Sequence, residues 1–301
     1  MAMVDFAFDF NNIWRIGLAV LQGRNPYLDL QSYYPPATTI LFGAFALVPI
    51  EIAYLILASV SALILVNAVK RKAIGWLFFV PVFFMFVAGQ IDLLFFALIP
   101  FLDREDWKAP VAAALFTLKP QIAAVVLPWY LWRWLRGNRI MLARLSACAL
   151  ALHLAPIFVR PTIYAEWIAT TGYGAGHKFG GIGIWRLSGP IVWPVIAVVS
   201  VGLIILALRS DEKTSRIALT LANPVFAYYD AVMLIETAPW YILTPASILA
   251  LVTSHMIGET HAPFAIVPIA ALLYRLGLTI TALTSRISVR SAEGERKARA
   301  C

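Results

Sequence analysis

Charged residues are scarce in this sequence. Only 13% of its 301 residues are Asp, Glu, Lys or Arg, whereas 61% are hydrophobic. Soluble domains carry about a quarter charged residues, so this chain lacks the polar groups that would cover a water-soluble globule of its size. The scarcity excludes an ordinary soluble domain. It predicts an all-α, polytopic membrane protein, because helices satisfy their own backbone hydrogen bonds within lipid.

Cysteine and the common catalytic signatures are also nearly or wholly absent. The two cysteines, Cys148 inside an apolar run and Cys301 at the terminus, are too few for a metal cage and badly placed for a disulfide. There is no Gly-rich phosphate loop, HExxH or GxSxG. We therefore expect no metal site and no required cofactor. Residues 1–11 lack a basic n-region, so no cleavable signal peptide is predicted.

A series of apolar runs fills most of the chain after its first 36 residues. The runs cover 37–50, 52–69, 73–88, 91–102, 109–118, 121–132, 140–158, 187–208, 217–235, 238–257 and 263–284. A full crossing needs about 20 residues, so the shorter runs are expected to be broken or re-entrant. We predict about nine to eleven membrane segments in one transmembrane domain over 1–285. Residues 1–36 would form an outer loop, and 286–301 a basic tail.

The net charge of +8 comes largely from basic clusters between these runs. Lys and Arg collect in cytoplasmic loops, which explains the charge without nucleic acid as a partner. Four segments are therefore predicted to be cytoplasmic: Lys70–Lys72, Asp103–Lys108, Arg133–Arg139 and Arg209–Arg216. On this topology Gly89-Gln90, Lys119-Pro120 and the 159–186 loop lie on the outer side.

The first polar segment, Asp5 to Pro36, is unlike the rest of the chain. Residues 11–22 have apolar positions at helical spacing, with Asn11 and Asn12 as candidate N-caps and Gly23 just past the end. This pattern predicts a short amphipathic helix that lies on the membrane surface. A turn at 24–27 follows the helix.

Ionisable groups inside apolar runs are candidates for function, because burying them in lipid is unfavourable. One interpretation is a single outward-facing cavity, with Asp9 or Asp5 as a base and with cations that bind a phosphate. The candidate cations are Lys119, His177, Lys178 and Arg186. The alternative is that such residues mark helix ends and extend to the headgroups.

Several short motifs occur in a familiar order. They are Asp9-Phe10, the 11–22 helix, Gly23-Arg24-Asn25-Pro26-Tyr27, Tyr34-Pro35-Pro36, Gly89-Gln90, Leu118-Lys119-Pro120-Gln121, Asn223-Pro224 and Tyr228-Tyr229-Asp230. Together they resemble the polyprenol-phosphate-mannose-dependent mannosyltransferases, which form family 87 of the GT-C glycosyltransferase superfamily. The resemblance covers most of residues 5 to 235.

The resemblance implies a GT-C-like helical bundle with Asp9 as catalytic base and Asp5 as the second choice. The donor would be a polyprenyl-phosphate sugar, mannose or another hexose, and transfer to a glycan or glycolipid acceptor of the envelope would invert the anomeric centre. The enzyme would sit in the inner (plasma) membrane among membrane lipids and face the periplasmic side. The motifs supply candidate substrate-binding residues: Arg24, Asn25, Tyr27, Tyr34, Gln90, Asp92, Tyr229 and Asp230.

Two other classes of protein fit the same composition. A transporter or lipid flippase would line a pathway with the intramembrane charges and is expected to show inverted repeats. A catalytically inactive relative would serve as a scaffold for envelope assembly. The first class predicts substrate flux without a covalent product, and the second predicts co-purification of a partner.

Overall fold

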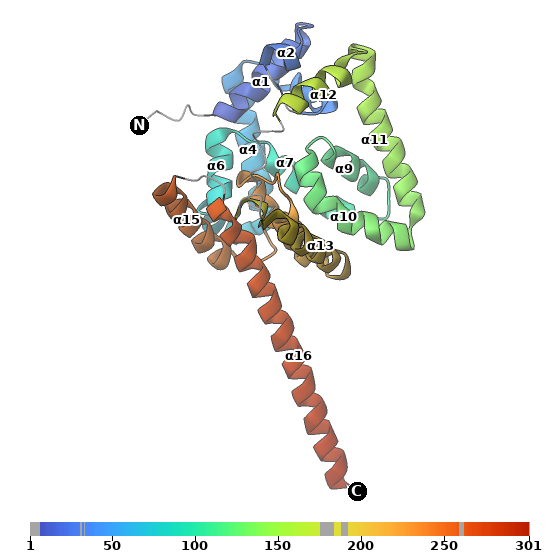
Figure 1. The fold of residues 1–301 in the computed structure, drawn as a ribbon, viewed down its shortest axis with the longest axis vertical. Helices are drawn as coiled ribbons and strands as arrows, with labels where there is room; N and C mark the ends of the chain where they lie inside the picture. Colours follow the sequence, from blue (N-terminus) through green and yellow to red (C-terminus); the bar gives the residue numbers. More distant parts are fainter. Residues whose placement is uncertain are drawn as a thin grey trace.

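A computed structural model describes residues 7–30, 32, 34–174, 184–187, 192–258 and 262–300. Every named element within these ranges is a helix (Figure 1). The elements are α1 (Phe8–Leu21), α2 (Pro26–Leu30), α3 (Pro36–Phe42), η1 (Phe45–Leu47), α4 (Ile50–Val69), η2 (Lys70–Lys72), α5 (Ala73–Leu77), α6 (Val80–Ala88), α7 (Asp92–Phe96), α8 (Ile99–Leu102), α9 (Lys108–Phe116), α10 (Pro120–Gly137), α11 (Arg139–Val159), α12 (Ile163–Gly174), η4 (Ile184–Leu187), α13 (Trp193–Arg209), α14 (Glu212–Ala222), η6 (Tyr229–Leu234), α15 (Trp240–Ile257), η7 (Ala262–Ala265) and α16 (Ile266–Ala300).

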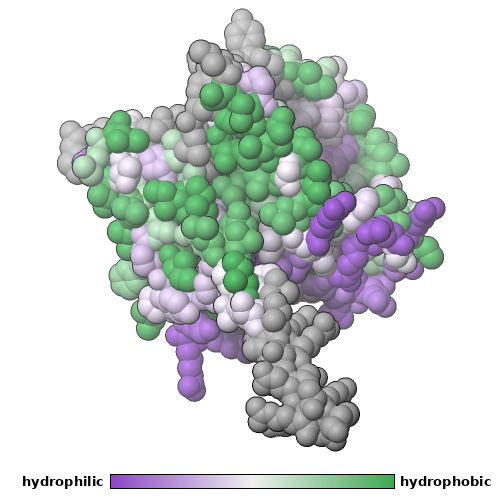
Figure 2. Space-filling view, turned by 60° about the horizontal axis from the view of Figure 1, so that its bottom comes forward, coloured by the Kyte–Doolittle hydropathy of each residue, from purple (hydrophilic) through white to green (hydrophobic). Residues whose placement is uncertain are grey.

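Four helical stretches in the described residues are long and apolar enough to cross a membrane. They are Ile50–Leu77, Arg139–Val159, Trp240–Ile257 and Ala262–Ala282. Large hydrophobic side chains are exposed on many of the helices, and they cover much of the face seen in Figure 2. Water-soluble proteins rarely expose so much apolar surface. The prediction of an all-α, polytopic membrane protein is confirmed.

The four long spans in the described residues are fewer than the nine to eleven membrane segments expected, of which the shorter ones were expected to be broken or re-entrant. Run 73–88 is divided into α5 and α6, because Pro81 cannot continue a helix that started earlier. Run 217–235 is divided as well, because α14 ends at Ala222 just before Pro224. Three shorter apolar helices, Pro36–Leu47, Asp92–Leu102 and Trp193–Arg209, fall below the length of a full span.

Helix α1 is the amphipathic helix that the sequence predicted, but it begins three residues before Asn11. Its N-cap is Ala7, which makes no side-chain cap, so the expected asparagine cap is wrong. The earlier start puts Asp9 in the first helical turn, where a carboxylate is favoured by the helix dipole. Gly23 follows the helix with φ +68°, so the predicted glycine stop is confirmed.

One face of α1 is fixed against α3 and η1. Gly17 lies so close to α3 that a Cβ there would be 2.1 Å from the Phe42 carbonyl oxygen. The Trp14 indole donates a hydrogen bond of 3.0 Å to the Val48 carbonyl. These contacts, together with the burial of Phe10, set the position of the residues in the first turn of α1.

Three of the four basic clusters meet at one end of the bundle. Arg133 pairs with Asp103 at 2.9 Å. The Trp129 indole donates to the Ser210 carbonyl at 2.9 Å, and Asp211 pairs with Arg275 at 2.7 Å. These contacts join the predicted cytoplasmic segments 103–108, 133–139 and 209–216 at a common level, as a shared membrane face requires.

Candidate active site

Asp9 contacts a residue that follows it by more than eighty positions. The Gln90 side-chain amide donates a hydrogen bond of 2.7 Å to Asp9 Oδ2. Gly89, at the end of α6, has φ +73°, and a Cβ there would lie 2.4 Å from Phe10 Cβ. Glycine is therefore required at this turn, both for its conformation and for the close approach of α1. The turn brings the Gly-Gln motif to the first turn of α1.

A buried group of three charges lies beside this pair. Lys119 Nζ binds the carboxylate of Asp92 and lies 2.8 Å from Asp230 Oδ1. All three residues are buried, with relative exposures of 1% or less. Asp92 begins α7, Lys119 precedes α10 and Asp230 lies in η6. One ammonium thus joins two carboxylates from elements that are distant in the sequence.

Two acceptor oxygens in this cluster have neither a hydrogen-bond partner nor an ion-pair partner in the described part of the chain. They are Asp92 Oδ2 and Gln90 Oε1, and both are buried. Buried polar atoms usually have partners. Such unpaired acceptors can take hydrogen bonds from the hydroxyl groups of a ligand.

Aromatic side chains surround the Lys119 ammonium. It lies 5.1 Å from the centre of the Tyr229 ring, within the range of a cation–π contact. Tyr34 is close enough to be affected by the charges of Lys119 and Asp9, and burial raises the pKa of its hydroxyl. The Thr38 hydroxyl donates to the Leu118 carbonyl at 2.5 Å, which ties the start of α3 to the residue before Lys119.

Asp9 is in an environment that suits a proton acceptor. Burial raises the pKa of the Asp9 carboxyl above its ordinary value. The hydrogen bond from Gln90 and the positive charge of Lys119 act in the opposite direction. The balance is a carboxylate that is more basic than one in water.

The turn after α1 supports the site from one side. Asn25 Oδ1 accepts hydrogen bonds from the backbone N–H groups of Tyr27 at 2.9 Å and Leu28 at 3.3 Å. The Tyr27 hydroxyl donates to the Tyr34 carbonyl at 3.1 Å. Arg24 is exposed and bonds to Gln22. Asn25 and Tyr27 therefore hold the backbone of this segment, and the structure does not bring Arg24 into the charged cluster.

Four of the predicted residues are not placed by the structure. Asp5, His177 and Lys178 lie outside the described residues, and of Arg186 only the backbone, in η4, is described. Their predicted roles as a second base and as phosphate ligands stay predictions.

The sequence reasoning did not single out Glu166 on α12. Its carboxylate accepts hydrogen bonds from Arg160 at 2.8 Å and from the Thr162 hydroxyl at 2.7 Å. The Asn25 side chain also lies against it, and together these groups lower the pKa of Glu166 although burial raises it. Helix α12 thereby contacts the turn after α1, as Figure 1 shows near α2. The polar 159–186 stretch was the only signal of this contact.

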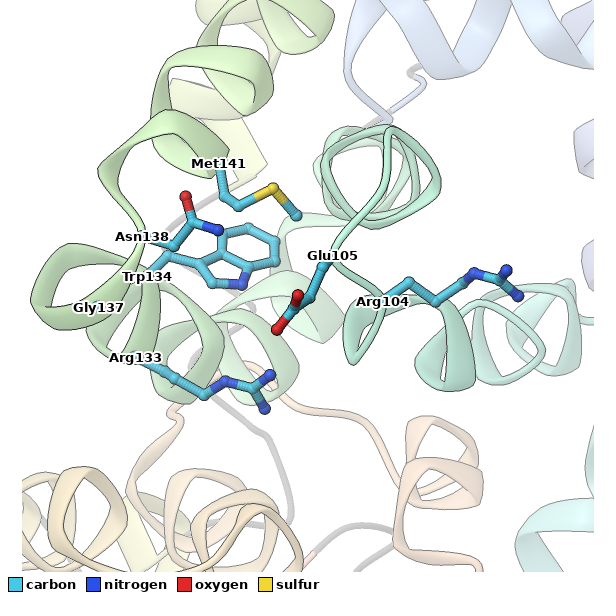
Figure 3. Close-up of a pocket in the computed structure, with 7 residues that line it drawn as sticks. All are labelled: Arg104, Glu105, Arg133, Trp134, Gly137, Asn138 and Met141. Atoms are coloured by element: carbon cyan, nitrogen blue, oxygen red, sulfur yellow. The ribbon is translucent and has the colours of Figure 1, made fainter.

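A cavity lies away from this cluster. It has a volume of 230 Å³ and lies at the basic end, between Glu105, Arg133, Trp134 and Met141 (Figure 3). Helix α10 runs from the Lys119 junction to this cavity, and 18 helical residues span about 27 Å. The cavity in Figure 3 is therefore not the outward-facing cavity predicted around Asp9 and Lys119, which stays a prediction.

Among the described residues, no three His, Cys, Asp or Glu side chains gather as metal ligands. The arrangement is that of a polytopic membrane protein with a carboxylate-rich, lysine-containing cluster. This cluster could accept a proton and bind hydroxyl groups.

The model of glycosyltransferase family 87 matches residues 33–252, which is well over half of the chain. The chain therefore belongs to glycosyltransferase family 87 and is a glycosyltransferase. The match includes Gln90, Lys119 and Asp230, whereas Asp9 precedes it. No curated protein and no solved structure matches this chain.

Proposed function

We propose that this glycosyltransferase transfers mannose or another hexose from a polyprenyl-phosphate donor to an envelope glycan or glycolipid, with Asp9 as the base. The observation that carries the proposal is the hydrogen bond between Gln90 and Asp9 beside the buried Lys119 group. A family motif and the candidate base thus lie in one place. The raised pKa of Asp9 makes it a better acceptor for the proton of a hydroxyl group.

The proposed reaction is one displacement. Asp9 takes the proton of the acceptor hydroxyl as its oxygen attacks the anomeric carbon of the sugar. The bond from that carbon to the phosphate oxygen breaks, and the polyprenyl phosphate leaves with the electron pair. Base and leaving group are on opposite faces of the sugar, so the anomeric centre inverts. The step needs no nucleotide and no cofactor.

We assign binding roles from the hydrogen-bonding atoms and charges that are still unpaired in each side chain. Gln90 Oε1 and Asp92 Oδ2 are unpaired acceptors, and we assign them to sugar hydroxyl groups. The Lys119 ammonium is already bound by two carboxylates, so a phosphate would compete with them there. We therefore leave most of the donor-phosphate binding to His177, Lys178 and Arg186, with charge stabilisation as their role.

The membrane placement is part of the proposal. Three of the four basic clusters share one end of the bundle, and Asp9 lies near Lys119, at the opposite end of α10. If Lys and Arg mark the cytoplasmic face, the cluster around Asp9 faces the outer, periplasmic side of the inner membrane. A lipid-linked donor could enter it from within the bilayer.

The test is Asp9→Asn in purified full-length protein. Radiolabelled polyprenyl-phosphate mannose and a membrane lipid extract serve as donor and acceptor source. We expect transfer to fall by at least about a hundredfold, in the range found for loss of a general base. Glu51→Gln is the matched control, because it removes an exposed carboxylate at the start of the neighbouring α4.

Full transfer by the Asp9→Asn protein, at an unchanged unfolding temperature, would refute the assignment of the base and would direct attention to Asp5. The anomeric configuration of the product, measured by NMR, tests inversion separately. A product with the configuration of the donor would contradict the single displacement.

A further inference from the structure

The cavity at the basic end is built from three parts of the chain. Glu105 comes from the loop after α8, Trp134 from the last turns of α10, and Met141 from the first turn of α11. Figure 3 shows the Glu105 carboxylate directed toward Trp134 and Arg133, while Arg104 points away. The volume of the cavity, 230 Å³, is below the roughly 300–1,000 Å³ of sites that bind drug-sized ligands. The cavity therefore suits a small polar group.

The charges around the cavity are not all paired. The Arg133 guanidinium uses one nitrogen for Asp103, at 2.9 Å, and Arg104 pairs with Asp106 at 3.1 Å. A guanidinium has five N–H donors, so Arg133 has donors left for an anion. Glu105 is solvent-exposed, and within the described part of the chain its carboxylate forms no ion pair with Arg104 or Arg133, which pair with Asp106 and Asp103. The cavity thus contains a carboxylate without an ion-pair partner, Glu105, and a guanidinium, Arg133, that can donate further hydrogen bonds.

Exposed tryptophans close in sequence to the cavity residues indicate that the cavity lies at the depth of lipid headgroups. Trp107 and Trp132, which neighbour Glu105 and Arg133 in the sequence, are 55% and 36% exposed, and exposed Trp residues mark the membrane–water boundary. Arg144 stacks on Trp107 at 4.8 Å, and Arg136 stacks on Trp132 at 5.1 Å. This combination of exposed Trp rings and Arg side chains is typical of the membrane–water boundary.

We propose that this cavity binds the phosphoethanolamine headgroup of a membrane phospholipid. The lipid ammonium donates to the Glu105 carboxylate beside the Trp134 ring, and the lipid phosphate accepts from the free nitrogens of Arg133. The two lipid charges are adjacent in the headgroup, as the two side chains are in the cavity. A phosphatidylglycerol, whose headgroup has no ammonium, would satisfy Arg133 but would place no cation at Glu105.

The test measures thermal unfolding of the full chain in detergent with added phospholipids of identical acyl chains. We expect a phosphatidylethanolamine to raise the unfolding midpoint more than a phosphatidylcholine, whose methylated ammonium cannot donate hydrogen bonds, and more than a phosphatidylglycerol. Glu105→Gln should remove most of the extra shift from phosphatidylethanolamine. Arg136→Gln, which lies outside the cavity, should keep it.

Three results would overturn the proposal. They are equal shifts with all three lipids, an undiminished response of Glu105→Gln, and a phosphatidylglycerol shift as large as that of phosphatidylethanolamine. Soluble phosphoethanolamine distinguishes the headgroup from a free metabolite. If it matched the lipid at equal concentration, the assignment to a membrane lipid would be wrong. None of these outcomes depends on sugar transfer.

Discussion

Removal of the Lys119 ammonium is the most informative single change to this protein. In Lys119→Met the side chain is shortened by only one atom, but the carboxylates of Asp92 and Asp230 lose the cation that joins them. Both carboxylates have a relative exposure of 0%, so water cannot replace it. The variant therefore leaves two like charges close together in a buried site.

The expected magnitude follows from that burial. Breaking a buried ion pair by removing one partner destabilises a protein by about 3–5 kcal/mol, because the remaining charge is uncompensated. In domains of 150–250 residues, each kcal/mol lowers the unfolding midpoint by about 2–4 °C. We therefore expect Lys119→Met to unfold roughly 6–20 °C below the unaltered protein.

The assay is thermal unfolding in detergent, with two comparison proteins. Lys108→Met removes an exposed lysine at the start of α9 and should change the midpoint little. A triple variant, Lys119→Met with Asp92→Asn and Asp230→Asn, removes all three charges and should unfold above the single variant. A single variant within about 2 °C of the unaltered protein, or a triple variant less stable than the single, would refute the buried-charge reasoning.

Two further predictions concern the packing and the acidity of α1. Gly17→Ala places a methyl group 2.1 Å from the Phe42 carbonyl oxygen, so we expect a loss of about 1–3 kcal/mol in thermal unfolding. Gly137→Ala, which meets nothing within 4 Å, is the control, and equal midpoints for the two would contradict the close packing. Gln90→Leu removes a hydrogen bond that lowers the pKa of Asp9. Because Asp9 must be deprotonated to act, activity is lost as pH falls through its pKa, and this loss should occur at higher pH in the variant. An unmoved acid limb in the rate–pH profile would argue against Asp9 as the base.

The helices could be predicted from the sequence where the apolar pattern was long and uninterrupted. Run 140–158 became α11 (Arg139–Val159), and run 238–257 became α15 (Trp240–Ile257). Hydropathy did not identify where a helix ends inside an apolar run, as at Asn223-Pro224, because averaging over a window hides the effect of a single proline. It could not tell which runs are full spans, because short helices packed in a bundle are as apolar as spanning ones.

The site was only partly predictable. Asp92, Lys119 and Asp230 were each recognisable as charges in apolar surroundings, but their mutual pairing depends on packing between elements far apart in the sequence. The contact of Asp9 with Gln90 likewise requires the close approach of α1 to Gly89. Glu166 on α12 was not recognisable individually, because a carboxylate in a stretch that was expected to be a polar loop has no unusual local context.

The shared Lys119 ammonium has a consequence for how the chain is made. During synthesis Asp92 precedes Lys119 by 27 positions, so these two opposite charges can enter the membrane together as a neutral pair. Asp230 emerges much later, and only then does the lysine gain its second carboxylate. A ribosome-bound chain that stops before η6 would therefore contain the Asp92–Lys119 ion pair but not Asp230. The cluster would be completed by one of the last segments to insert.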